Sequence, residues 1–192
     1  MILKHNAEIL IGDYSKSDQL NEEVLRCLKS ARGIDTANSN VKASLHTDWN
    51  WELYNPIFKD LKVFLMRETH KKFSPGKMCV GHKDLICKTF WANVYQKGDY
   101  ANTHCHKPSA YSFAYFVKSK WYDSPLIFTD SGKRMRPKEG RYIIFPSYLK
   151  HRVPKNLFNH TRITLSGNFD LIYLINIKRI DIILNSKNNQ RI

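Results

Sequence analysis

The chain has 192 residues and a formal net charge of +14, from 31 lysines and arginines against 17 aspartates and glutamates. A hydrophobic content of 42% with only 8 glycines and 7 prolines excludes a fibrous or linker-rich chain and is typical of one globular domain. The positive charge favours anionic partners, such as nucleic acid, an acidic protein or an anionic metabolite. The basic residues are spread along the chain, however, and AT-rich coding alone would also enrich lysine. The charge by itself therefore does not establish a nucleic-acid partner.

Cysteine usage and the apolar segments predict a soluble cytoplasmic protein. The four cysteines form no CxxC pair, which favours a reduced, intracellular setting. The N-terminus has no apolar run long enough for a signal peptide. The apolar stretch 171–184 is too short to span a bilayer, and Lys178, Arg179 and Asp181 interrupt it. We therefore expect no membrane partner.

The first predicted element is a helix within residues 15–33. Ser17 or Asp18 can cap its N-terminus, and Gly33 is a stop signal. Apolar residues at helical spacing give it one buried face: Leu20, Val24, Leu25 and Leu28.

A second helix is predicted within residues 55–73. Pro56 suits the first helical turn, and Pro75 with Gly76 ends the segment. Its apolar residues again follow helical spacing: Ile57, Leu61, Phe64 and Leu65. Between the two helices, residues 38–53 read as a strand and a loop.

The pattern changes to short strands after about residue 85. The expected strand segments are 84–98, 110–119, 124–130, 140–155 and 161–174. Short strands at close spacing indicate an all-β sandwich or barrel. We expect one domain of residues 1–192: a helical support region (1–84), a β core (85–175) and a C-terminal strand and tail (176–192).

The segment "NTHCHK", residues 102–107, places two histidines two positions apart. On an extended backbone, His104 and His106 point to the same face and can approach one ion. Two half-exposed strand histidines are the alternative. His151, 45 positions after His106, is a plausible third ligand. Three side chains on one face of an ion, with the opposite positions open, fit an oxygen-activating non-haem iron site.

Arg162 and Thr164 lie two positions apart on the predicted last strand. Their guanidinium and hydroxyl groups therefore share one face and suit a carboxylate. Cys105, between the two histidines, could have a redox role. A strand residue at i+1 points away from its neighbours, however, so structural filler is the preferred interpretation.

Four segments together resemble a known family. They are "NVYQKGDYANTHCHKPSAYSFAYFVK", "SPLIFTD", "GRYIIFPSYLKHRVPKN" and "RITLSGNF". In order and spacing they resemble the 2-oxoglutarate/Fe(II)-dependent dioxygenase superfamily, and within it a small bacterial and phage group of oxygenases with an HxH motif. The resemblance covers roughly residues 90–170. It implies a mainly β, cupin-like jelly roll (double-stranded β-helix) with flanking N-terminal helices, Fe(II), 2-oxoglutarate as cosubstrate, and O2.

The resemblance also implies roles for individual residues. The metal ligands would be His104, His106 and His151, with no further catalytic residue. The 2-oxoglutarate pocket would include Arg162, Thr164, Asn93, Tyr95 and Tyr115. Most of the superfamily has an acid where this chain has His106. Three alternatives follow: the site uses three imidazoles, takes an acid from elsewhere such as Asp130, or holds another metal.

The implied activity is a hydroxylase-type dioxygenase that decarboxylates 2-oxoglutarate to succinate while oxidising an unknown substrate. That substrate would be a protein side chain, a small molecule or a nucleotide, in the host cytoplasm if a phage encodes the chain. One alternative is a three-histidine cupin-type metalloenzyme that does not use 2-oxoglutarate. The other is a non-catalytic β-barrel that binds nucleic acid through its charge and stacks bases on aromatics in "WYDSP" (121–125) or "AYSFAYF" (110–116).

Overall fold

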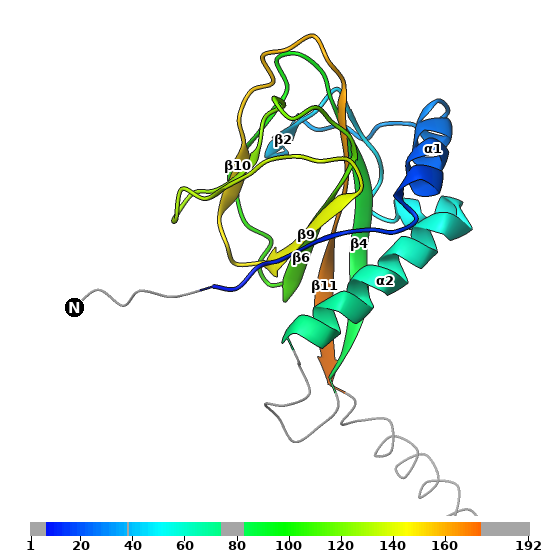
Figure 1. Ribbon diagram of the computed structural model, residues 1–192, viewed down its shortest axis with the longest axis vertical. Coiled ribbons are helices and arrows are strands. Elements are labelled where there is room, and N and C mark those ends of the chain that lie inside the picture. Colours follow the sequence, from blue (N-terminus) through cyan, green and yellow to red (C-terminus); the bar gives the residue numbers. More distant parts are fainter. Residues whose placement is uncertain (1–6, 38, 74–82, 174–192) are drawn as a thin grey trace, which may run out of the picture.

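The computed structural model describes residues 7–37, 39–73 and 83–173, and Figure 1 shows their arrangement. Two antiparallel sheets face each other, and two α-helices pack on the outer side of one of them. This is the jelly roll that the family resemblance implied, and the prediction of a mainly β fold with flanking N-terminal helices is confirmed.

The larger sheet has six strands in the order β1-β9-β6-β11-β4-β3. Its longest pairing joins β11 to β4 over the full length of β11. The bounds are Leu10–Asp13 (β1), Arg141–Pro146 (β9), Tyr111–Lys118 (β6), Arg162–Tyr173 (β11), Lys83–Tyr95 (β4) and Leu45–His46 (β3).

The smaller sheet has five strands in the order β2-β5-β10-β7-β8. They are short: Val41–Lys42 (β2), Tyr100–His104 (β5), His151–Val153 (β10), Leu126–Phe128 (β7) and Arg134–Met135 (β8). β1, β5 and β8 were not predicted from the sequence as separate strands. β1 and β8 are at the edges of their sheets, where few contacts shape the local sequence.

The helices are α1 (Ser17–Leu28) and α2 (Pro56–Phe73), with a 3-10 turn η1 (Trp51–Tyr54) before α2. The limits of α2 agree with the prediction. α1 ends five residues before Gly33, and no side chain caps its N-terminus. The turn from β1 provides backbone partners instead: Ser17 N–H donates to Tyr14 O over 3.1 Å. The expectation that Ser17 or Asp18 caps this helix is therefore wrong.

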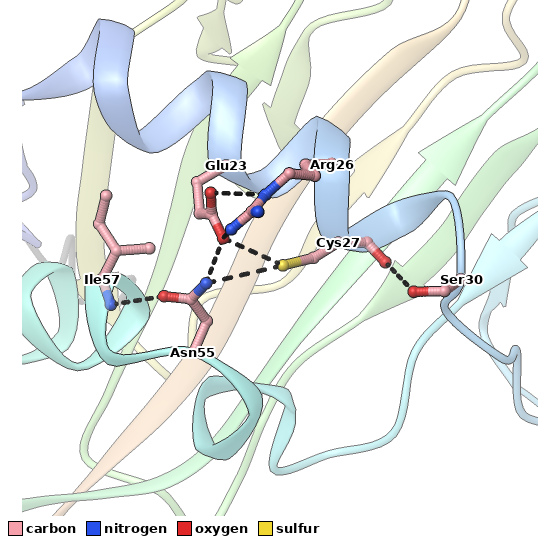
Figure 2. A network of polar contacts seen from close by, with 6 residues as sticks. All are labelled: Glu23, Arg26, Cys27, Ser30, Asn55 and Ile57. Carbon is pink, nitrogen blue, oxygen red and sulfur yellow. Dashed lines mark hydrogen bonds and ion pairs between the residues drawn. The ribbon is translucent and has the colours of Figure 1, made fainter.

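Asn55 joins the two helices, as Figure 2 shows. Its side-chain oxygen accepts the N–H of Ile57 over 2.9 Å, which caps the first turn of α2. Its amide nitrogen donates to Glu23 on α1, and Glu23 also accepts two hydrogen bonds from Arg26. The start of α2 is thus tied to the middle of α1.

Strand alternation separates two cores. On β11, Ile163 and Leu165 face the helices, while Arg162 and Thr164 face the space between the sheets. The helix-side core includes Phe58, Leu61, Phe90, Phe113 and Tyr115. The inter-sheet core includes Tyr95, Phe116, Phe128, Ile143 and Phe145. Polar side chains on the inner face of β11 therefore do not compete with the packing of the helices.

The region before residue 85 contributes strands as well as helices. β1 pairs with β9, β2 with β5 and β3 with β4, so this region completes both sheets. The expected strand and tail at 176–192, and Pro75 with Gly76, lie outside the described residues. Among the residues that the structure describes, none of the helices has both the length and the apolar character needed to cross a membrane.

Candidate metal centre

Three histidines meet at one end of the smaller sheet. His104 ends β5, and His151 begins β10 directly opposite it in the strand register. Their ring centroids are 4.4 Å apart, and the ring of His106 is 4.9 Å from that of His104 and 5.1 Å from that of His151. One ring nitrogen from each histidine lies within 4.8 Å of the other two. This spacing suits a single ion bound by three imidazoles.

Backbone carbonyls fix the orientation of two of these rings. His104 Nδ1 lies 2.6 Å from Asn102 O, and His151 Nδ1 lies 2.9 Å from Leu149 O. A carbonyl only accepts, so each Nδ1 carries the proton and each Nε2 keeps its lone pair. A second hydrogen bond of this kind is the usual way in which proteins orient a metal-binding histidine.

His106 follows the end of β5, so the extended backbone expected through both histidines stops between them. Its position is held differently: its N–H donates to Ser147 O over 2.8 Å. Ser147 is fully buried, and its hydroxyl lies 2.7 Å from that of Ser112. This hydrogen bond to the segment after β9 holds the backbone of His106 where its ring lies close to the other two.

All three histidines are held neutral. Burial, with the neighbouring histidines as further causes, lowers the pKa of His106 to about 3. Burial, with His104 as a further cause, lowers the pKa of His151 to about 4. Burial also lowers the pKa of His104. Neutral imidazoles can coordinate a metal without first losing a proton, so the cluster is ready for a cation at neutral pH.

A narrow cavity of about 50 Å³ continues from the histidines into the space between the sheets. β4 contributes Asn93 and Tyr95, and β11 contributes Arg162 and Thr164. Thr164 is paired with Asn93 in the register, and Arg162 with Tyr95. The structure therefore brings these four expected residues to one cavity with the three histidines. A large substrate would have to approach the cluster from outside it.

Arg162 is the buried cation of this cavity. It is 2% exposed, and its guanidinium carbon lies 4.9 Å from the ring centroid of Tyr95 and 5.5 Å from that of Phe116. Burial lowers the pKa of Arg162, yet its Nε and Nη1 have no hydrogen-bond partner among the described residues. A buried guanidinium with open donors is costly unless an anion binds it. A carboxylate provides a strong, charge-assisted acceptor for such a donor.

Tyr115 requires a correction, because it lies outside the cavity. On β6 its side chain points toward the helices, where its hydroxyl donates to Asn21 of α1 over 2.9 Å. Both faces of β6 are buried, so the apolar pattern of this strand did not reveal which face meets the cavity. Burial raises the pKa of this phenol.

Two further residues of the site were missed. Trp91 lines the cavity, its ring centroid is 6.0 Å from that of His106, and its buried Nε1 has no hydrogen-bond partner among the described residues. It stands two positions before Asn93, so strand alternation could have identified it. Ser147, which holds His106, is part of the "FPS" sequence that carried the resemblance.

Asp130 and Cys105 do not join the cluster. Asp130, the alternative acid, is exposed in the turn between β7 and β8. Among the described histidines, cysteines and acidic residues, the group at this site that could hold a metal ion consists of the three histidines alone. Cys105 is a free, partly buried thiol. The arrangement is thus a jelly roll with a three-histidine centre beside a buried arginine.

Comparison with known proteins points to the 2-oxoglutarate/Fe(II) oxygenases. A sequence model of the family described as "Putative 2OG-Fe(II) oxygenase" matches residues 129–168, which include His151, Arg162 and Thr164. No curated protein matches the chain in sequence. This match confirms the resemblance noted in the sequence, and solved structures share the fold.

Three of those structures are 2-oxoglutarate complexes or prolyl hydroxylases. The viral collagen prolyl hydroxylase of Paramecium bursaria chlorella virus-1, in complex with 2-oxoglutarate, has a TM-score of 0.59 at 13% identity and covers 84% of this chain and 94% of its own. A prolyl-4-hydroxylase of Pseudomonas putida has a TM-score of 0.55 at 13% identity, with 85% and 92% covered. HygX of Streptomyces hygroscopicus, with nickel and 2-oxoglutarate bound, has a TM-score of 0.61 at 11% identity, with 85% and 83% covered. Fe(II), 2-oxoglutarate and O2 are the cofactors of this class of enzyme.

Proposed function

We propose that the protein is an Fe(II)- and 2-oxoglutarate-dependent dioxygenase of the hydroxylase type. The observation that carries the proposal is the pairing, in one cavity, of three neutral histidines with a buried arginine whose Nε and Nη1 have no partner among the described residues. The first group suits a divalent metal, and the second suits a carboxylate. The family match and the 2-oxoglutarate-bound relatives of the same fold support this interpretation.

In this proposal His104, His106 and His151 hold the metal through one nitrogen each. Asn102 O and Leu149 O accept the protons of His104 and His151 and keep their Nε2 atoms aimed at the ion. His106 stands where the superfamily has an acid, so these three proposed ligands bring no negative charge to the metal. The 2-oxoglutarate dianion would supply that charge, which makes cosubstrate and metal binding mutually dependent.

Arg162 would bind the carboxylate of 2-oxoglutarate that lies farther from the metal. Tyr95 and Phe116 pack against its guanidinium and fix its direction. Thr164 and Asn93, paired on neighbouring strands, add a hydroxyl and an amide to the same face of the cavity. The hydrophobic walls exclude water and strengthen the attraction between the two charges.

The bound cofactors supply the oxidation: 2-oxoglutarate, O2 and a substrate C–H group become succinate, CO2 and a hydroxylated product. The protein contributes ligation, orientation and exclusion of water. The alternative of a three-histidine enzyme without 2-oxoglutarate gives no role to the open donors of Arg162. The substrate would meet the metal from outside, because the cavity beside the histidines is narrow.

The test is succinate formation from 2-oxoglutarate by the full chain with Fe(II), O2 and ascorbate. We expect slow turnover without a substrate, abolished by a chelator and by Arg162→Met. Arg152→Gln, which removes an exposed charge outside the cavity, serves as the control and should leave turnover unchanged. Turnover that is unaffected by Arg162→Met would refute the assignment of this arginine. No turnover and no binding of 2-oxoglutarate to the Fe(II)-loaded protein would refute the proposal.

A further inference from the structure

The loop between β6 and β7 and the loop between β10 and β11 expose aromatic side chains that contact one another, outside the metal centre. Trp121 is 74% exposed, and Phe158 is 45% exposed. Tyr122 lies between them, with its ring centroid 5.7 Å from that of Trp121 and 4.7 Å from that of Phe158. Exposed apolar side chains that adjoin one another mark a candidate interaction site.

The two loops are held together beneath these rings. His160 Nε2 lies 3.4 Å from the buried carboxylate of Asp123, and Asp123 also accepts the N–H of Lys120 over 2.7 Å. Ser124 donates to Lys155 O over 3.1 Å. The aromatic group is therefore displayed on a fixed base, which lowers the entropy lost on binding.

Basic side chains border the same loops. Arg136 donates to Trp121 O over 3.4 Å, and Lys155 lies 5.9 Å above the ring of Tyr100 on the outer face of the smaller sheet. Beside Lys155, β5 and β10 form a hollow of about 280 Å³. Its lining includes Tyr100, Asn102, Thr103, Arg152 and Lys155. We call Trp121, Tyr122, Phe158, Arg136, Arg152 and Lys155 the aromatic–basic surface.

Acidic groups near this surface are already engaged. The Asp123 carboxylate is buried against His160, and Glu139 accepts the N–H of Ser119 over 2.9 Å. Among the residues described, no ion pair joins Arg136, Arg152 or Lys155 to a carboxylate. Their positive charge is therefore available to an external anion.

We propose that the aromatic–basic surface binds single-stranded nucleic acid. Exposed rings offer faces on which bases stack, and cations beside them neutralise the phosphates between those bases. An anionic membrane would touch the loop tips, whereas the cations continue from the loops onto the sheet as far as Arg152. An acidic protein would use the charges but gain less from three adjoining rings. Single-stranded nucleic acid uses both features.

This surface is distinct from the metal centre. None of its six residues lines the cavity of the histidines. Tyr100 and Val153 stand at the ends of β5 and β10 opposite to His104 and His151. The loop from β10 to β11, which carries Phe158, lies at the top of Figure 1. The inference goes beyond the oxygenase proposal and holds whether or not that proposal is correct.

The test is fluorescence anisotropy of a labelled oligothymidylate titrated with the full chain over a range of salt concentrations. The wild-type chain should bind the single strand more tightly than a duplex of equal length. Arg152→Gln/Lys155→Gln should reduce the magnitude of the salt slope by about 1.4, at roughly 0.7 per phosphate contact. Trp121→Ala should weaken binding by roughly 5- to 100-fold, with Trp121→Phe closer to wild type.

The matched control is Lys59→Gln/Lys71→Gln, which removes two exposed charges from α2. Thermal unfolding would show that each variant is folded. An equal loss in the control pair would overturn the proposal, because the total charge would then explain the binding. Equal affinity for duplex, binding to anionic phospholipid vesicles but not to the oligonucleotide, or no binding at all would also overturn it.

Discussion

His104 and His151 face each other across the antiparallel pair of β5 and β10, with ring centroids 4.4 Å apart. The hydrogen-bond register of the sheet therefore sets the distance between two of the three proposed ligands. His106 has no such support from the sheet and depends on Ser147 for its position. The two kinds of support lead to different expectations for substitution.

Replacing His151 should remove the metal. His151→Ala leaves two imidazoles, and we expect metal content after loading and desalting to fall from one ion per chain to below about a tenth. The measurement is elemental analysis of the purified protein. His70→Ala, on the exposed side of α2, is the control and should retain the metal. Stoichiometric metal in His151→Ala would show that this histidine is not a ligand.

His106 tests whether an imidazole replaces the usual acid. We expect His106→Ala to lose metal, and His106→Asp to retain it, because a carboxylate restores the ligand set most common in this superfamily. The dissociation constant for Fe(II) or a surrogate such as Mn(II) decides the matter in both variants. If His106→Ala binds the metal as tightly as the wild type, the third ligand must come from elsewhere.

Replacing Arg162 should preserve or raise the thermal stability of the protein but weaken its binding of 2-oxoglutarate. Arg162→Met removes a buried charge with open donors, so the ligand-free variant should unfold at the same or a higher temperature than the wild type. Its affinity for 2-oxoglutarate should fall by roughly 10- to 100-fold, as expected for a lost charge-assisted pair. Thermal unfolding with and without 2-oxoglutarate measures both. Equal stabilisation of the two proteins by 2-oxoglutarate would contradict the assignment.

The lowered pKa values predict acid sensitivity of the metal-free protein. His106 and His151 have pKa values of about 3 and about 4 when folded, against about 6.5 in an unfolded chain. The unfolded chain therefore binds more protons between these values, and the free energy of unfolding falls as the pH drops through this window. We expect roughly 2–3 kcal/mol of loss from one such group between about pH 7 and pH 4.

Urea unfolding at several pH values in the presence of a chelator measures this loss. His106→Gln should lose less stability than the wild type over the same window, because one group that resists protonation is gone. The other titrating groups are common to both proteins and cancel in the comparison. Parallel pH curves for the two would contradict the pKa assignment.

Gly167 tests the close packing of β11. A Cβ at this position would lie 2.4 Å from Thr89 O and 2.5 Å from a ring carbon of Phe113. The β4 backbone cannot move away without breaking its ladder with β11, so Gly167→Ala should destabilise the fold by about 2–3 kcal/mol. Gly33→Ala, where the nearest atom is 3.6 Å away, is the control in chemical unfolding. Similar free energies for the two variants would contradict the packing.

Much of the site could be predicted because its residues follow simple alternation. Arg162 and Thr164 are two positions apart on one strand, and the structure places both in the cavity. Tyr115 was assigned to the wrong face because β6 is apolar on both sides, so its sequence has no polar face to mark. The position of His106 depends on a contact with Ser147, some forty residues away along the chain. A local sequence pattern does not reveal such a contact.

The most direct test of the central claim is anaerobic calorimetric titration of the full chain with 2-oxoglutarate, with and without Fe(II). If the three histidines and Arg162 form one site, the Fe(II)-loaded protein should bind one 2-oxoglutarate per chain. Affinity should then fall by at least about tenfold when either the metal or the Arg162 guanidinium is removed. Binding that is indifferent to both, or no binding by the loaded protein, would contradict the account.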